Sequence, residues 1–415
     1  MKNIIAICAA CGIGILAVSA QPILPKNKIP FGIGPGIRQN IENLYQESAE
    51  ARAAAIIKLG DMKEKAAVAV PFLVEMLSDS GSLKPYGMVS TKAAEALVKI
   101  GAPSVEPLIG VLKNSRERVV RSAAASALGQ LHDARAIEPL IESFRGEDSL
   151  FRLYVAEALG QIGKPAIGSL SVLLENRNEI MREAATVSLG QIAMFKRDTR
   201  AAEYLLISLR DDDVAVRRQA AVALYNISGW YKMPAAIDAA IVALEDADAE
   251  VASYCALSLG ASGAYQAINP LIKALGRKGN VESAQGFMNF DVYENAVNAL
   301  TKIGKPAASV LRDALHDRDR YTRQGAATVL GRIKDLYAIE PLIGALGDTE
   351  EGVRLASRDA LITIGVPATW PIIVAFRSAE GPAQQLIAGI LTKITGENLG
   401  LDQAKWYDWY QRRNN

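Results

Sequence analysis

The chain has few of the residues that build disulfide frameworks. Only three cysteines occur in 415 residues, and Cys8 and Cys11 both lie within residues 1–20. If that segment is removed, Cys255 remains alone and an internal disulfide is excluded. Cys255 lies in the apolar stretch SYCALSLG, with no histidine or basic residue beside it. A buried small side chain is therefore favoured there over a reactive thiol.

Histidines and catalytic motifs are also scarce. The two histidines, His132 and His316, are far apart in the sequence, and each precedes an aspartate. They cannot form a metal site unless many carboxylates converge on them. The chain has no G-x-S-x-G motif and no phosphate-loop lysine followed by a hydroxyl residue. The sequence thus predicts no catalytic residue, no metal site and no cofactor.

Net charge of either sign is lacking as well. Lys and Arg number 46 against 45 Asp and Glu, which gives a formal charge of +1, and aromatic residues make up only 6% of the chain. Nothing in this balance favours a polyanionic partner, so we expect no nucleic-acid binding. The length suits either a few ordinary domains or one extended repeat array.

The N-terminus has the pattern of a secretory signal peptide. Lys2 precedes an apolar run from Ile4 to Val18, and Val18-Ser19-Ala20 supplies the small residues that a signal peptidase reads. The run is short for a transmembrane helix, which leaves a retained anchor as the alternative. We expect residues 1–20 to be cleaved near Ala20, the protein to be periplasmic or secreted, and the mature chain to have no membrane span. Residues 21–44, rich in Pro and Gly, predict an irregular lead-in.

A repeat accounts for residues 45–395. The leucines that close successive alanine-rich segments, here called marker leucines, are spaced by 31, 31, 30, 35, 35, 41, 30 and 31 residues. They are Leu97, Leu128, Leu159, Leu189, Leu224, Leu259, Leu300, Leu330 and Leu361. A further copy precedes them and a degenerate one follows. Self-similarity at this period is typical of a solenoid, whose single units cannot bury their apolar faces alone.

Each repeat divides into two helical halves. The first half, as in VRSAAASALGQL, has apolar residues at helical spacing and alanines that permit close packing. The second, as in IEPLIESF, begins near a proline, which a first helical turn tolerates. The turn between them has a short form, as in IGKP, and a long form, as in LGQLHDARAIEP. Both forms predict Gly at the end of one helix and Pro at the start of the next. We predict an all-α fold, a right-handed α-α superhelix of about ten helix pairs.

Three features together resemble the short HEAT-like repeats of phycobilisome lyases and other bacterial proteins. They are the A-x-x-A-L-G core, the I-E-P-L-I-x-x-L second helix and an Arg seven residues before the marker leucine. This Arg recurs as Arg121, Arg152, Arg182, Arg217, Arg323 and Arg354. We expect it to pair with acids of the inter-repeat turns rather than to hold an acidic ligand. The resemblance implies the fold, but not one activity, because such repeats occur in enzymes, assembly factors and scaffolds.

Two inserts interrupt the repeats at residues 78–91 and 276–290, and inserts in a solenoid often contribute to binding surfaces. The tail, residues 396–415, breaks the repeat and predicts an aromatic helix that caps the last repeat. Its ending resembles that of some secreted bacterial HEAT-repeat proteins. Binding of a partner is the alternative for this tail. For the apolar side chains of the inserts, packing over the disrupted repeat is favoured over binding of a partner. The candidate partner-binding residues are Tyr86, Met88, Phe287, Met288, Phe290, Trp406 and Trp409.

We therefore expect a non-enzymatic scaffold or adaptor that binds another protein through the curved solenoid surface formed by the second helices and through the inserts. The alternative is an enzyme or enzyme subunit with a lyase-like site on the concave face. The lyases join tetrapyrroles to phycobiliproteins inside the cell, and an export signal argues against that activity. A chemical site needs converging titratable groups, whereas a scaffold needs only surface.

Overall fold

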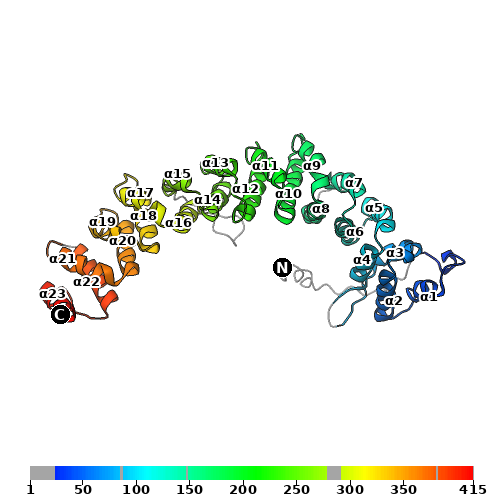
Figure 1. The fold of residues 1–415 in the computed structure, drawn as a ribbon, viewed down its shortest axis with the longest axis horizontal. Helices are drawn as coiled ribbons and strands as arrows, with labels where there is room; N and C mark the ends of the chain where they lie inside the picture. The colour runs from blue at the N-terminus through cyan, green and yellow to red at the C-terminus, as the bar shows by residue number, and fades with distance from the viewer. Residues whose placement is uncertain (1–23, 85–86, 146–147, 278–290, 380–381, 415) are drawn as a thin grey trace. The chain divides into compact units, whose positions relative to one another are not determined.

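All regular structure in the described chain is helical. The computed structural model describes residues 24–84, 87–145, 148–277, 291–379 and 382–414 (Figure 1). This part contains 23 α-helices and short 3₁₀ helices, and its only β-type pairing is an isolated bridge between Ser82 and Met88. The all-α prediction is confirmed. The chain divides into two compact units, unit 1 (Met1–Asp198) and unit 2 (Thr199–Asn415).

Unit 1 is built from consecutive helix pairs. Its α-helices are α1 (Pro35–Asn43), α2 (Ala49–Asp61), α3 (Val70–Glu75), α4 (Val89–Ile100), α5 (Val105–Asn114), α6 (Arg118–Leu131), α7 (Ile137–Glu142), α8 (Ser149–Ile162), α9 (Ile167–Leu173) and α10 (Glu179–Lys196). Its 3₁₀ helices are η2 (Lys26–Lys28), η3 (Lys63–Ala69), η4 (Met76–Ser78), η5 (Ala102–Ser104), η6 (Ala134–Ala136), η7 (Ser143–Arg145) and η8 (Lys164–Ala166).

Unit 2 continues the same alternation. Its α-helices are α11 (Thr199–Ser208), α12 (Val214–Ser228), α13 (Pro234–Ala243), α14 (Ala249–Ser262), α15 (Ile268–Ala274), α16 (Val292–Ile303), α17 (Ala308–Ala314), α18 (Arg320–Arg332), α19 (Ile339–Gly344), α20 (Glu351–Ile364), α21 (Thr369–Ala375), α22 (Pro382–Thr395) and α23 (Gln403–Asn414). Its 3₁₀ helices are η9 (Tyr265–Ala267), η10 (Lys305–Ala307), η11 (Leu336–Ala338), η12 (Ala345–Gly347) and η13 (Val366–Ala368).

Within each unit the helices form two layers. The even-numbered helices from α2 to α20 are called first helices. Those from α4 to α20 contain the marker leucines, and α2 belongs to the repeat copy before them. The odd-numbered helices from α3 to α21 are called second helices. Neighbouring first helices contact one another much more extensively than neighbouring second helices do. A stack whose repeats are closer in one layer than in the other curves toward the closer layer. The first helices therefore line the inner side of the curvature within a unit, and the second helices lie on the outer side.

The close packing of the first helices depends on the glycine that follows the marker leucine. A Cβ at Gly129 would lie 2.6 Å from the Cα of Ala158, and a Cβ at Gly260 would lie 2.5 Å from the Cα of Ala299. Real Cβ atoms do not approach backbone this closely, so only glycine fits. The glycine of the A-x-x-A-L-G pattern therefore indicates a backbone contact between the first helices of successive repeats.

The two turn forms end the first helix differently. In the short form, Gly101, Gly163, Gly304 and Gly365 follow the helix with φ of 78° to 90° and ψ of −133° to −140°, a region that only glycine occupies readily. In the long form, the left-handed residue after the helix is His132, Gly263 or Lys334. The prediction of a terminal glycine was therefore wrong for two of the three long turns, where the glycine of the pattern lies inside the helix.

The lead-in at residues 21–44, predicted to be irregular, contains the helix α1. Pro35 follows the N-cap Gly34 at the first helical position, where proline is well tolerated. Ile41 and Leu44, three residues apart, are fully buried, and α1 packs against α2. Packing thus stabilises a helix in a segment whose composition alone favours irregular structure.

Candidate interaction surface

The repeated arginines primarily bind backbone carbonyls. The Nη1 atom of Arg217 donates to the carbonyl oxygens of Asp211 and Asp212, at 2.9 and 3.0 Å. Equivalent pairs of bonds are made by Arg52, Arg121, Arg182, Arg323 and Arg354 to the carbonyls five and six residues earlier. Each guanidinium therefore closes the turn that precedes its own helix by satisfying carbonyls that lack helical partners.

Some of these arginines also join one repeat to the next. Arg217 pairs with Asp246 through two bonds of 2.8 and 3.2 Å, and Arg323 pairs with Asp348 at 2.7 and 2.9 Å. The bonds from Arg323 hold the pKa of the Asp348 carboxyl below its usual value. The expected pairing with turn acids is thus correct for Arg217 and Arg323. At Arg121 the neighbour across the repeat is the ring of Phe151, 4.9 Å away.

Three repeats lack the arginine, and one of them receives a substitute from its neighbour. The position seven residues before Leu259 is Ala252. Arg277, at the end of the following second helix, donates to the carbonyl oxygens of Leu244 and Asp246. The carboxylate of the same Asp246 binds Arg217 of the preceding repeat. Arg277 therefore anchors the chain at the start of the second insert, and no sequence period reveals this role.

The first insert is anchored at its base. Arg52 and Asp79 are fully buried and form a two-bond pair at 2.6 and 3.0 Å. The carboxylate of Asp79 also accepts a bond from the Gly81 amide, and the Val89 amide donates to the Gly81 carbonyl. Met88, one of the candidate partner-binding residues, is exposed beside this base. The candidates Tyr86, Phe287, Met288 and Phe290 lie outside the described residues.

The C-terminal helix α23 packs against α21. Trp406 is fully buried, and its indole Nε1 donates to the Gly400 carbonyl at 2.9 Å. Trp409 meets the edge of the Trp406 ring at 6.2 Å and remains partly exposed. Trp370 of α21 stacks on Tyr410, with ring centroids 4.8 Å apart. Contact of Trp406 with a partner would require α23 to leave this position.

The two histidines and Cys255 lie in separate parts of the fold. His132 ends α6 and is exposed, and His316 is exposed after α17. Cys255 is buried in α14, and burial raises the pKa of its thiol far above the ordinary value. In the described part of the chain, no cluster of three or more His, Cys, Asp or Glu residues could hold a metal ion.

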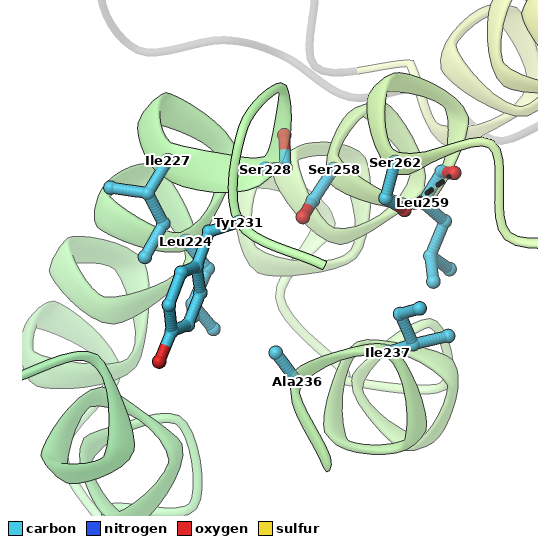
Figure 2. Close-up of a pocket in the computed structure, with 9 residues that line it drawn as sticks. All are labelled: Leu224, Ile227, Ser228, Tyr231, Ala236, Ile237, Ser258, Leu259 and Ser262. Carbon is cyan, nitrogen blue, oxygen red and sulfur yellow. Dashed lines mark hydrogen bonds between the residues drawn. The ribbon is translucent and has the colours of Figure 1, made fainter. Parts of the chain in front are cut away.

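A cavity between α12, α13 and α14 is too small for a ligand (Figure 2). The enclosed space is about 10 Å³, which holds at most a single water molecule. Two of its serine hydroxyls are already engaged, since Ser262 donates to the Leu259 carbonyl and Ser228 to the Tyr225 carbonyl. Leu224, Ile227 and Ile237 supply apolar lining (Figure 2). The cavity is a feature of core packing.

Exposed aliphatic side chains recur at equivalent repeat positions in both layers. On the second helices they are Val172, Ile207, Val242 and Val374. At the starts of the first helices of unit 1 they are Met88, Val119, Leu150 and Ile180, a set called the apolar row below. Among the described helices, no single one is long and apolar enough to cross a membrane. Glu351–Ile364 and Val366–Ala375 satisfy that test only as a pair bent by 113°.

Comparison with protein families gives one match that extends over more than half of the chain. The model for HEAT repeats matches residues 37–129, 85–152, 137–226, 281–362 and 309–380. Over 202 residues the chain is 30% identical to a phycocyanobilin lyase subunit alpha of Picosynechococcus, covering 44% of this chain and 74% of that relative. Over 138 residues it is 30% identical to an uncharacterized phycocyanin operon protein Z of Pseudanabaena tenuis, covering 31% of this chain and 67% of that relative.

Two solved structures of similar fold belong to larger proteins. Kap121p bound to Pho4p matches with a TM-score of 0.55 and 12% identity, over 91% of this chain and 46% of that one. Kap95p with RanGDP matches with a TM-score of 0.51 and 13% identity, over 91% of this chain and 57% of that one. The chain thus spans about half the length of these structures, and the likeness is one of fold alone.

Proposed function

Because the chain belongs to the HEAT-repeat family, we propose that it is a non-enzymatic scaffold or adaptor that holds another protein on the surface of its stacked helices. In a solenoid each repeat contacts only its neighbours, so both helix layers stay open to solvent along the stack. A scaffold needs such a surface, whereas catalysis needs titratable groups that converge on one point.

The observation that carries this proposal is the recurrence of exposed aliphatic side chains. Isolated exposed aliphatic residues are normal on soluble proteins. Here the apolar row occupies the same position of four successive repeats. The repeated arginines, by contrast, are engaged with turns of the protein itself. The surface available to a partner therefore presents aliphatic side chains among polar ones, as other protein-binding surfaces do.

Affinity capture from the cell envelope of the source organism tests the proposal. The mature protein serves as bait, with an unrelated solenoid of similar size as the control bait. We expect at least one protein to be retained reproducibly by this chain and not by the control. Equal retention on both baits would remove the support for a scaffold.

We also propose that the protein acts in the periplasm or outside the cell. The support is the arrangement of Lys2, the apolar run and Val18-Ser19-Ala20 in residues 1–20. Mass spectrometry of the protein from its native host checks this, with an N-terminus at Gln21 expected. Recovery of a chain that begins at Met1 in the cytoplasm would contradict export.

A second candidate function is that of an enzyme or an enzyme subunit. It is favoured by the 30% identity to a phycocyanobilin lyase subunit. Incubation of the purified protein with phycocyanobilin, followed by absorption spectroscopy, separates the two candidates. A scaffold without bilin chemistry leaves the spectrum of the pigment unchanged, whereas a lyase-like site shifts it.

A further inference from the structure

We infer that the apolar row docks one α-helix of the partner, an amphipathic helix with a large apolar residue at about every seventh position and carboxylates beside it. This inference rests on the proposed scaffold function and specifies the partner segment. It concerns unit 1 alone.

The apolar row has a regular geometry. Each member lies nine residues before its marker leucine, at the start of α4, α6, α8 or α10. These four first helices pack successively against one another. An ion pair of 3.1 Å between Arg118 and Asp148 ties the start of α6 to the start of α8. Val119 and Leu150 therefore stand at neighbouring helix starts, and the exposed Leu153 widens the row on α8.

The apolar row is confined to these four repeats. The equivalent position in the preceding repeat is Glu50. In the repeats of unit 2 the equivalent residues are Ala215, Glu250, Asp291, Tyr321 and Gly352. Exposed aliphatic residues at this position are thus not a requirement of the repeat. Their restriction to consecutive repeats gives a surface of defined length.

The spacing of the row favours a helix as the occupant. Packed helices lie about 8–10 Å apart, and seven residues of α-helix advance about 10.5 Å. Four repeats therefore match a helix of about 20 residues. An extended segment would bring unpaired N–H and C=O groups to a face made of helices, which in the described chain offers no strand edge. A helix satisfies its own backbone.

The charge beside the row favours carboxylates on the partner. One exposed cation precedes each row member by three to five residues, namely Lys84, Arg116, Arg145 and Arg177. Among the described residues Arg116, Arg145 and Arg177 form no ion pair. The pKa of the exposed Glu50 carboxyl, by contrast, is lowered by a backbone hydrogen bond and also by the nearby Lys84. The exposed acids of the same turns are Glu117, Glu175 and Glu179. Glu117 and Glu179 stand at helix starts, where the helix dipole already favours a carboxylate. Among the described residues of these turns, Arg116, Arg145 and Arg177 are thus left beside the row to bind carboxylates of a partner.

Photo-crosslinking in the native host tests the inference. A benzoylphenylalanine is placed at Val119 or Leu150 of the full chain, and the crosslinked partner peptide is sequenced. The matched control position is Val172 on the second helix α9 of the same unit, because its 73% exposure is close to the 65% of Val119. Val242 serves as the control in unit 2.

We expect positions 119 and 150 to crosslink to one partner segment, at partner residues about seven apart, within an acidic amphipathic sequence. Crosslinks at Val172 or Val242 alone, or contact sites about three residues apart in an extended segment, would overturn the inference and leave the scaffold function standing. No crosslink at any of the four positions would overturn both.

A synthetic helix provides a second measurement. The probe is a peptide of about 20 residues with Leu at every seventh position and Glu on both flanks, titrated against the full chain. Val119→Ser and Leu150→Ser should each weaken binding about tenfold, whereas Val172→Ser should leave it unchanged. A Lys-for-Glu peptide should bind at least tenfold more weakly. Absence of binding by the Glu peptide, or equal loss in all three variants, would count against the docked helix.

Discussion

The backbone of Ala360 in α20 lies so close to Gly331 in α18 that a Cβ on the glycine would be 2.5 Å from the Cα of the alanine. The same relationship between successive first helices joins Gly60 to Ala96, Gly129 to Ala158 and Gly260 to Ala299. It sets the separation of these four pairs of first helices, because no side chain lies between the two backbones.

The first prediction is that Gly331→Ala destabilises unit 2 by about 1–3 kcal/mol, since the added methyl group forces α18 and α20 apart. The control is Gly389→Ala in α22, where a Cβ meets no atom within 4 Å. That change should stabilise by about 0.5–1 kcal/mol, because alanine favours a helix more than glycine does. Denaturant unfolding of both variants gives the two free energies. A change in unfolding free energy of the same sign in both variants would contradict the assigned role of Gly331.

The second prediction concerns acid. Arg323 lowers the pKa of Asp348 in the folded protein, so this pair stabilises unit 2 fully above about pH 4, the ordinary value for aspartate. The stabilisation is lost as the pH falls through the lower folded value. Asp348→Asn should cost about 1–3 kcal/mol at pH 7 and less at pH 3. Melting temperatures measured from pH 7 to pH 3 test this. Glu245→Gln, which breaks an exposed pair with Lys273, should cost at most about 1 kcal/mol.

The third prediction uses Cys255 as a reporter of local opening. Its buried thiol, with a raised pKa, should resist alkylation in the folded protein. Leu224→Asp places a carboxylate in the core of the adjacent helix α12 and should speed alkylation of Cys255. Leu97→Asp in unit 1 should leave it protected, because repeats interact mainly with their neighbours. Mass spectrometry of the Cys255 peptide measures both rates. Equal acceleration by the two variants would indicate all-or-none unfolding.

The fourth prediction separates the two tryptophans of the tail. Trp406→Ala removes a fully buried ring and should cost about 3–5 kcal/mol. Trp409→Ala removes a partly exposed ring, with the edge contact to Trp406, and should cost about 1 kcal/mol. Melting curves and partner capture on each single variant provide the test. Unchanged stability with lost capture for Trp406→Ala would make the tail a binding site in place of a cap.

The repeat pattern in the sequence carries most of the fold. It predicts helix pairs, turn positions and the pairing of Arg217 and Arg323 with turn acids, because these depend on residues at fixed spacing. Arg277 could not be predicted, since it fills the place of a missing arginine from a different repeat position. The stacking of Trp370 on Tyr410 likewise joins residues whose proximity only the folded chain defines.

The candidate surface was harder to predict than the fold. Met88 is a candidate partner-binding residue because it lies in the first insert, yet its repeat position makes it equivalent to Val119, Leu150 and Ile180. Apolar residues at helical spacing are normally assigned to a core, so the exposure of Val119 gives no signal in the sequence. The left-handed conformation of His132 and Lys334 also gives no signal in the sequence, because glycine is the residue expected in that conformation.

The contact of glycine with alanine backbone has a mechanical consequence. When a unit bends, the first helices joined by such a contact can neither approach one another, because their backbones already touch, nor separate without losing that contact. Bending therefore changes the distances between the more widely separated second helices. The distances between these first helices are unaffected. Distances along such pairs, including the one between Val119 and Leu150, therefore stay constant when the unit bends.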